Sequence, residues 1–193
     1  KASARRWALM VNQHRDERAQ PVFCLVDTGR VMKMPFAGMT LLDYGVNAAL
    51  VLANIALLKQ DRAGLVTFAH EIGTTVPAER RSGQLHALLE ALYNVRTRFL
   101  ESDYERLYGH LRRVLRGRSL LLLFTNFETR AGMERQLPYL RALARQHVVV
   151  AVFFENTELR TLLDAPPVDT EQLYIKAVAE KFALEKREIV KDL

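Results

Sequence analysis

The sequence predicts an α/β fold: a three-layer sandwich with a mostly parallel sheet, one antiparallel edge strand and helices on both faces. Three continuously apolar runs, residues 21–27, 119–125 and 147–154, have the length and composition of strands buried on both sides. Helical patterns separate these runs, an alternation that is typical of a parallel sheet. Two further strand-like runs, residues 63–70 and 72–77, follow one another almost directly and predict an antiparallel hairpin.

The helices have recognisable starts. Thr40, followed three residues later by Asp43, resembles a capping box and predicts a helix to about Gln60. Because this helix is nearly all apolar, we expect it to be the most buried one. A loop is expected over residues 33–38. Further helices are predicted over residues 83–93, 103–115 with Ser102 as the cap, 134–146, and from Asp169 or Thr170 to about Lys191.

Length and cysteine content suggest one domain in a reducing compartment. A chain of 193 residues with 49% hydrophobic residues is sufficient for one core. Cys24 is the single cysteine and lies inside the first apolar run, so we expect a core thiol and no internal disulfide. No signal peptide is visible in residues 1–20. We therefore expect a cytoplasmic protein.

One apolar stretch, residues 41–58, has the length of a membrane helix. Its polar residues Asp43, Asn47 and Asn54 fall on one stripe of a helix, which favours an amphipathic helix packed on a core. We predict no transmembrane segment and no membrane contact for this chain.

The charge is basic and comes mainly from arginine. The formal net charge is +6, and the 28 basic residues are 21 Arg and 7 Lys. Such a balance is compatible with nucleic acid or an acidic protein as partner. The densest stretch has no run of like charge, which favours a solvated face over a nucleic-acid site; it contains Arg80, Arg81, Arg96, Arg98, Arg112, Arg113, Arg116 and Arg118.

The site is expected where two central strands end. Asp27 ends the first apolar run and Asn126 follows the second. Right-handed crossovers make these strands neighbours, and open α/β sheets bind ligands at the carboxyl ends of strands on either side of such a switch point. We therefore expect Asp27 and Asn126 to face one another.

The sequence does not favour an enzyme. A haloacid dehalogenase-type phosphatase needs a second acid two residues after the nucleophile, and that position is Gly29. The sequence has no Gly-rich phosphate loop, no Gly-x-Ser-x-Gly elbow and no His-Glu-x-x-His motif. The histidines lack metal-ligand spacing; they are His14, His70, His86, His110 and His147. A metal-dependent hydrolase is kept as the enzymatic alternative.

Five stretches together resemble the domain of unknown function 58 family over the whole chain. They are KASARRWALMV, LVDTGRVM, LDYGVNAALVLANIALLKQDRAGLVTF, ESDY and DTEQLYIKAVAEK. Members of that family have a von Willebrand factor A-like domain and are often encoded beside MoxR-type AAA+ ATPases. The resemblance implies one such domain over residues 1–193, with an N-terminal segment 1–20, a sheet core 21–165 and a C-terminal helix 166–193. It also implies a piece of a longer protein, whose parent could be anchored in a membrane.

Von Willebrand factor A domains often bind Mg²⁺ at a metal-ion-dependent adhesion site. The resemblance places the site's Asp-x-Ser-x-Ser motif at Asp27, but Gly29 and Val31 replace its serines and Asn126 replaces its strand-end aspartate. Ser102 or Asp103 stands in for the later-loop threonine. We expect a degenerate corner without metal or cofactor, with Mg²⁺ as the alternative; its residues are Asp27, Thr28, Gly29, Arg30, Val31, Ser102, Asp103 and Asn126.

Two expectations follow for this corner. Asp27 is expected to accept hydrogen bonds from backbone amides of its own turn. Arg30 is expected to receive the carboxylate of a partner.

The predicted function is a non-enzymatic protein-interaction module. By analogy with the family, its partner is a MoxR-type AAA+ ATPase, and its role lies in the assembly or maturation of protein complexes. The alternative is a nucleic-acid or polyanion binder that uses the arginines between Arg96 and Arg118.

Overall fold

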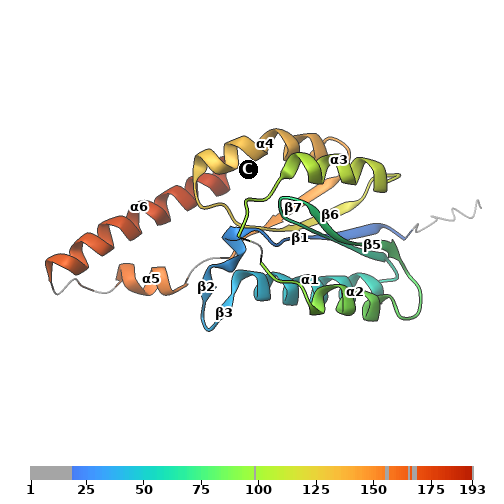
Figure 1. The fold of residues 1–193 in the computed structure, drawn as a ribbon, viewed down its shortest axis with the longest axis horizontal. Helices are drawn as coiled ribbons and strands as arrows, with labels where there is room; N and C mark the ends of the chain where they lie inside the picture. The colour runs from blue at the N-terminus through green and yellow to red at the C-terminus, as the bar shows by residue number, and fades with distance from the viewer. Residues whose placement is uncertain (1–18, 98, 155–156, 165, 167–168, 193) are drawn as a thin grey trace, which may run out of the picture.

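The fold is a five-stranded sheet between two layers of helices, as predicted (Figure 1). The computed structural model describes residues 19–97, 99–154, 157–164, 166 and 169–192. The sheet order is β5-β4-β1-β6-β7, and only β5 runs antiparallel to its neighbour. The strands are β1 (Pro21–Asp27), β4 (Arg62–Phe68), β5 (Ile72–Glu79), β6 (Leu120–Phe124) and β7 (Val148–Val152).

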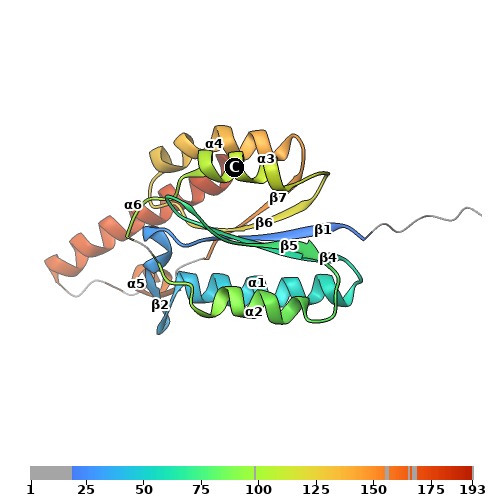
Figure 2. The same ribbon diagram turned by 45° about the vertical axis from the view of Figure 1, so that its right-hand side comes forward.

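Two helices cover each face of the sheet (Figure 2). On one side lie α1 (Leu41–Leu58) and α2 (Gln84–Tyr93), and on the other α3 (Tyr104–Val114) and α4 (Arg130–Ala144). The sheet separates two hydrophobic cores, one under each helix pair. Because the chain passes from one side of β1 to the other between β5 and β6, the carboxyl ends of β1 and β6 form the switch point.

The last two helices extend the molecule at the carboxyl edge of the sheet. They are α5 (Thr157–Asp164) and α6 (Thr170–Asp192). The C-terminal half of α6 packs against α4, whereas its N-terminal half projects beyond the body with α5 beside it (Figure 1). Leu173, Tyr174 and Val178 are therefore exposed on α6.

Helix α1 has the predicted capping box, with Thr40 and Asp43 bonded to one another's backbone amides. Of the described helices, α1 is the one that is long and apolar enough to cross a membrane by length and composition. Six of its residues are buried on the sheet, as in a core helix. Asp43, Asn47 and Asn54 are exposed, as predicted, but Val51, Ile55 and Leu58 are exposed as well.

Several predicted elements differ from the structure. Asp103, not Ser102, caps α3, because its carboxylate accepts the Arg106 amide at 2.9 Å. Helix α4 begins at Arg130 instead of residue 134, since Thr129 caps it by accepting the Gly132 amide at 3.1 Å.

The loop predicted over residues 33–38 contains short regular elements. The 3₁₀ helix η1 (Arg30–Lys33) precedes a small ribbon of β2 (Pro35–Phe36) and β3 (Met39–Thr40). Helix α5 lies within the predicted sheet core 21–165 and was not predicted from the sequence. Asp169 caps α6, because its carboxylate accepts the Gln172 amide at 2.7 Å.

Most of the predicted N-terminal segment 1–20, including its basic and apolar patches, lies outside the described residues.

Strand β7 was expected to be buried, and this was wrong. It is an edge strand of the described sheet, and Val148 and Val150 remain 43% and 42% exposed. An apolar run has the same composition whether or not another strand covers its outer side.

Cys24 is buried in the core as predicted, and burial raises the pKa of its thiol to about 12.

Candidate functional site

Asp27 lies at the switch point, where it accepts three hydrogen bonds. It ends β1 and is only 3% exposed. Its Oδ1 accepts the Gly29 amide at 2.8 Å and the Ser102 hydroxyl, and its Oδ2 accepts the Thr125 hydroxyl at 2.6 Å. Burial raises the pKa of the Asp27 carboxyl, and these hydrogen bonds oppose that rise because they favour the ionised form.

Tyr104 extends this cluster. Its hydroxyl lies 2.7 Å from the Thr125 hydroxyl, inside the core. Thr125 has one hydroxyl hydrogen and donates it to Asp27, so Tyr104 is the donor to Thr125. Burial, and then the charge of Asp27, raises the pKa of Tyr104 well above its usual value. Tyr104, Thr125 and Asp27 are therefore linked by two consecutive buried hydrogen bonds.

The neighbours of Gly29 leave too little space for a side chain at this position. Its φ of −71° is ordinary for any residue. A Cβ atom there would lie 2.1 Å from the Ser102 Oγ and 3.0 Å from the Asp27 Oδ1. The Ser102 hydroxyl therefore occupies the space that the first serine of an adhesion-site motif would need.

Ser102, and not Asp103, is the loop residue that contacts Asp27. Asp103 instead caps α3 and forms an ion pair with Arg106 at 3.1 Å. Thr28 also has a structural role, since both its amide and its hydroxyl donate to the Phe68 carbonyl, at 2.8 and 3.1 Å. The Thr28 bonds tie the end of β1 to the end of β4.

Arg30 already has partners within the chain. Its guanidinium is 2.6 Å from the Glu128 carboxylate and 4.0 Å from the Glu101 carboxylate. The Glu101 carboxylate is also 3.6 Å from the guanidinium of Arg135. Glu128 is therefore the partner of Arg30 within the chain, and binding of another protein's carboxylate by Arg30 stays a prediction. Val31 is in η1 and contributes no oxygen.

Asn126 and Asp27 line the same cavity, but the residue after β6 that bonds to Asp27 is Thr125. The two strands are neighbours, as predicted, with Val26 opposite Phe124. The Asn126 Oδ1 accepts the Phe127 amide at 3.0 Å and the ammonium of Lys186, which also donates to the Phe127 carbonyl. Burial lowers the pKa of Lys186 to about 8, and the charges of Glu128 and Glu185 oppose this.

Tyr104, Thr125 and Lys186 are the residues that sequence reasoning missed. Tyr104 belongs to the ESDY stretch that carries the family resemblance, and Thr125 directly precedes the predicted Asn126. Lys186 lies on α6, 60 positions from Asn126, and no pattern in the sequence links them.

The residues of the corner do not fit a resident Mg²⁺. This ion needs near-octahedral oxygen ligands. The Asp27 carboxylate is engaged by three donors, Asn126 receives an ammonium, and positions 29 and 31 lack side-chain oxygen. The cavity beside Asp27 and Ser102 measures about 70 Å³, so the ligand set and not the available space argues against the ion. Within the described ranges, no group of three or more His, Cys, Asp or Glu residues is placed to hold a metal.

Known proteins resemble this chain mainly in fold. A crystal structure of the conserved hypothetical protein BatB from Bacteroides thetaiotaomicron matches with a TM-score of 0.51 and 14% identity, covering 69% of this chain and 65% of that one. The SpRpn10 VWA domain matches with a TM-score of 0.45 and 10% identity, over 77% of this chain and 96% of that domain. Proximal thread matrix protein 1 of the mussel byssus matches with a TM-score of 0.45 and 11% identity, over 69% and 36%. No curated protein matches.

These results confirm the predicted fold class and family. The sheet order, the single antiparallel edge and the BatB likeness identify a von Willebrand factor A-like fold. The chain spans about 65% of the BatB chain that it matches. The family model described as "Protein of unknown function DUF58" matches residues 1–172, so that α6 lies almost entirely beyond the matched part. The chain belongs to the DUF58 family.

Proposed function

We propose that this chain is a non-enzymatic protein-interaction module that acts with a MoxR-type AAA+ ATPase in the assembly or maturation of protein complexes. Family membership and the use of this fold in protein interactions support the proposal. The observation that carries it is the enclosure of Asp27. A reactive carboxylate needs a lone pair directed at substrate, whereas this one is buried and binds three internal donors.

The enclosed carboxylate instead makes the corner rigid. It joins the end of β1, the loop before α3 and the end of β6 through buried, charge-assisted hydrogen bonds. A rigid corner is a suitable base for recognition, because little ordering of the surface is required when a partner binds.

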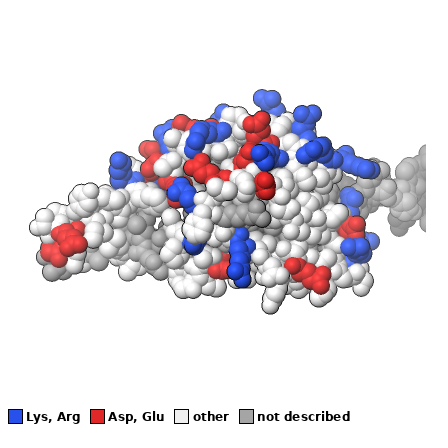
Figure 3. Space-filling view, viewed as in Figure 1, with Lys and Arg blue, Asp and Glu red and all other residues white. Residues whose placement is uncertain are grey.

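The rim of the corner carries paired charges of both signs. Arg30, Glu101, Glu128 and Arg135 are linked across it by ion pairs of 2.6 to 4.0 Å. On the face seen in Figure 3, acidic and basic side chains are interspersed over the upper half of the molecule. Exposed pairs of this kind contribute little to stability. They favour a protein partner, whose own charges can exchange with them, and they set its orientation.

The test is affinity capture from native extract with ATP present. We expect the tagged chain to enrich a MoxR-type AAA+ ATPase and Arg30→Glu to reduce that enrichment severalfold. Arg81→Glu is the matched control, since Arg81 also forms an exposed ion pair, with Glu79 at 3.0 Å, but lies at the opposite edge of the sheet. Failure to enrich any AAA+ protein, or equal effects of the two variants, would count against the proposal.

A cytoplasmic location is part of the same proposal. The lone thiol of Cys24 is buried and reduced, which suits a reducing compartment.

A polyanion-binding surface is the second candidate. Arg96 lies before α3, whereas Arg112, Arg113, Arg116 and Arg118 lie at or beyond its other end, so the predicted arginine stretch does not form one face. The latter four are exposed and form no ion pair with another described residue, which favours anion binding at that end alone. Such binding must weaken steeply with salt. Absence of a gel shift with DNA or RNA at low salt would exclude it.

A further inference from the structure

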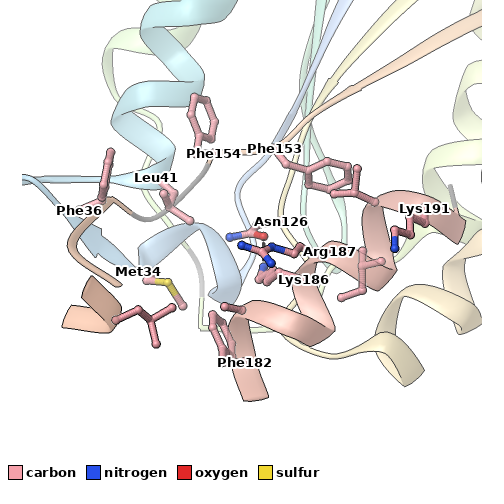
Figure 4. A pocket seen from close by; sticks show the side chains of 14 residues that line it. Met34, Phe36, Leu41, Asn126, Phe153, Phe154, Phe182, Lys186, Arg187 and Lys191 are labelled. Atoms are coloured by element: carbon pink, nitrogen blue, oxygen red, sulfur yellow. Dashed lines mark hydrogen bonds between the residues drawn. The ribbon is translucent and has the colours of Figure 1, made fainter. Parts of the chain in front are cut away.

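A larger cavity lies on the other side of Asn126. It measures about 530 Å³ and is enclosed by α6, the η1–β2 segment and the chain that follows β6 and β7 (Figure 4). Its walls are mainly aromatic and aliphatic, with Met34 and Phe36 on one side and Phe153, Phe154 and Phe182 around the rest. This size and apolar character are typical of sites for small ligands.

Among the described residues that line this pocket, the charged ones are all positive. They are Lys186, Arg187 and Lys191, which all come from α6. Arg187 and Lys191 are exposed and form no ion pair with a described residue. Figure 4 shows Lys186 and Arg187 beside Asn126 in the middle of the pocket, with phenylalanine rings on both sides.

Lys186 has capacity for one more acceptor. Its ammonium has three donors and gives two of them to the Asn126 Oδ1 and the Phe127 carbonyl. The nearby acids are engaged elsewhere, because Glu128 binds Arg30 at 2.6 Å and Glu185 accepts the Arg130 amide at 2.9 Å. Because Lys186 is partly buried, water screens its charge less than at the surface, so an anion at close range would be attracted to it more strongly.

We propose that this pocket binds an aliphatic carboxylate of fatty-acid type. Its hydrocarbon chain would lie among the phenylalanine side chains, where burial of apolar surface is favourable, and its carboxylate would meet Lys186 and Arg187. Phosphate-rich ligands fit less well, because they require many polar donors and this wall offers few. The pocket shares Asn126 with the corner around Asp27, but Lys186 and Arg187, which would bind the carboxylate, are not residues of that corner, so the proposal does not depend on the AAA+ partner.

The test uses laurate, with binding measured by calorimetry and by the NMR signal of its ¹³C-labelled carboxylate. We expect one saturable site and at least tenfold weaker binding of dodecanol, which lacks the charge, and of dodecyltrimethylammonium, which reverses it. Equal binding of laurate and dodecanol would overturn the proposal, as would the absence of saturable laurate binding.

Variants locate the site. Arg187→Gln should weaken laurate severalfold and leave dodecanol unchanged, whereas Lys181→Gln, an exposed lysine of the same helix outside the pocket, should change neither. Ala183→Phe should fill the pocket and abolish binding while the protein still melts cooperatively. Laurate binding that survives in folded Ala183→Phe, or equal effects of Arg187→Gln and Lys181→Gln, would contradict the assignment.

Discussion

Ser102 donates its hydroxyl hydrogen to the Asp27 Oδ1, across 75 positions of sequence. This one contact explains two features of the corner. It fills the space beside Gly29, where no Cβ fits, and it leaves Asp103 to cap α3. Thr125 binds the other oxygen of the same carboxylate from 98 positions away. Five predictions follow from this geometry and from that of Lys186.

Asp27→Ala should destabilise the protein far more than Asp27→Asn. Alanine leaves the Gly29 amide and the hydroxyls of Ser102 and Thr125 without their acceptor, at about 1–3 kcal/mol for each buried group that stays unpaired. Asparagine keeps one oxygen, and its amide can donate to Thr125, whose hydroxyl then turns towards Tyr104. Urea unfolding at pH 7 measures both variants.

A comparison of wild type with Asp27→Asn tests the pKa of Asp27. Burial raises the folded-state pKa, so the folded protein binds the proton more tightly than the unfolded chain does. Wild type should therefore lose stability relative to Asp27→Asn as the pH rises from the ordinary aspartate pKa of about 3.9 through the raised folded value. A constant difference between the two proteins across that range would contradict the raised pKa.

Gly29→Ala should destabilise the protein by about 1–3 kcal/mol, as overpacking of a core does. The added Cβ meets the Ser102 hydroxyl first, so Ser102→Ala in the same protein should recover part of the loss. A double-mutant cycle of urea unfolding measures this coupling. Additive effects of the two substitutions would show that Ser102 does not occupy the space beside Gly29.

Millimolar Mg²⁺ should leave the melting temperature unchanged. An ion that binds only the folded state at ten times its dissociation constant would add about 1.4 kcal/mol. For a domain of this size that corresponds to a shift of about 2–4 °C in differential scanning fluorimetry. We expect no shift, because donors already surround Asp27 and Ser102 fills the space of the missing serine. A Mg²⁺-dependent shift that Asp27→Ala abolishes would restore the adhesion-site interpretation.

Lys186 should make the protein more stable at alkaline pH. Its folded pKa of about 8 lies below the ordinary lysine value of about 10.4. Between these values the unfolded chain binds more protons, so the free energy of unfolding rises with pH, and the gain is lost as the pH falls through about 8. Urea unfolding at pH 7, 8.5 and 10 should show this slope in wild type and not in Lys186→Met. Parallel curves for the two proteins would contradict the lowered pKa.

The strands and most helices follow from local patterns that the sequence displays directly. The run from Pro21 to Asp27 is a strand because it is short, apolar and closed by a turn, and α1 starts at Thr40 because its cap lies three residues away. Helix α4 was predicted four residues late, because its first turn, from Arg130 to Met133, has only Met133 buried and therefore little apolar periodicity. These are short-range effects, which nearby residues decide.

The sequence by itself determined the fold, the family and the position of Asp27 at the end of a central strand. It also determined that the usual oxygen ligands are missing at Gly29 and Val31. Only the tertiary structure decided that Ser102 and Thr125 are the side chains that bind Asp27, that Arg30 pairs with Glu128, and that Lys186 reaches Asn126. The physical reason is range: hydrogen bonds and ion pairs act over a few ångströms between side chains that lie 60 to 98 positions apart in the chain, and only packing of the helices on the sheet brings these side chains within that distance.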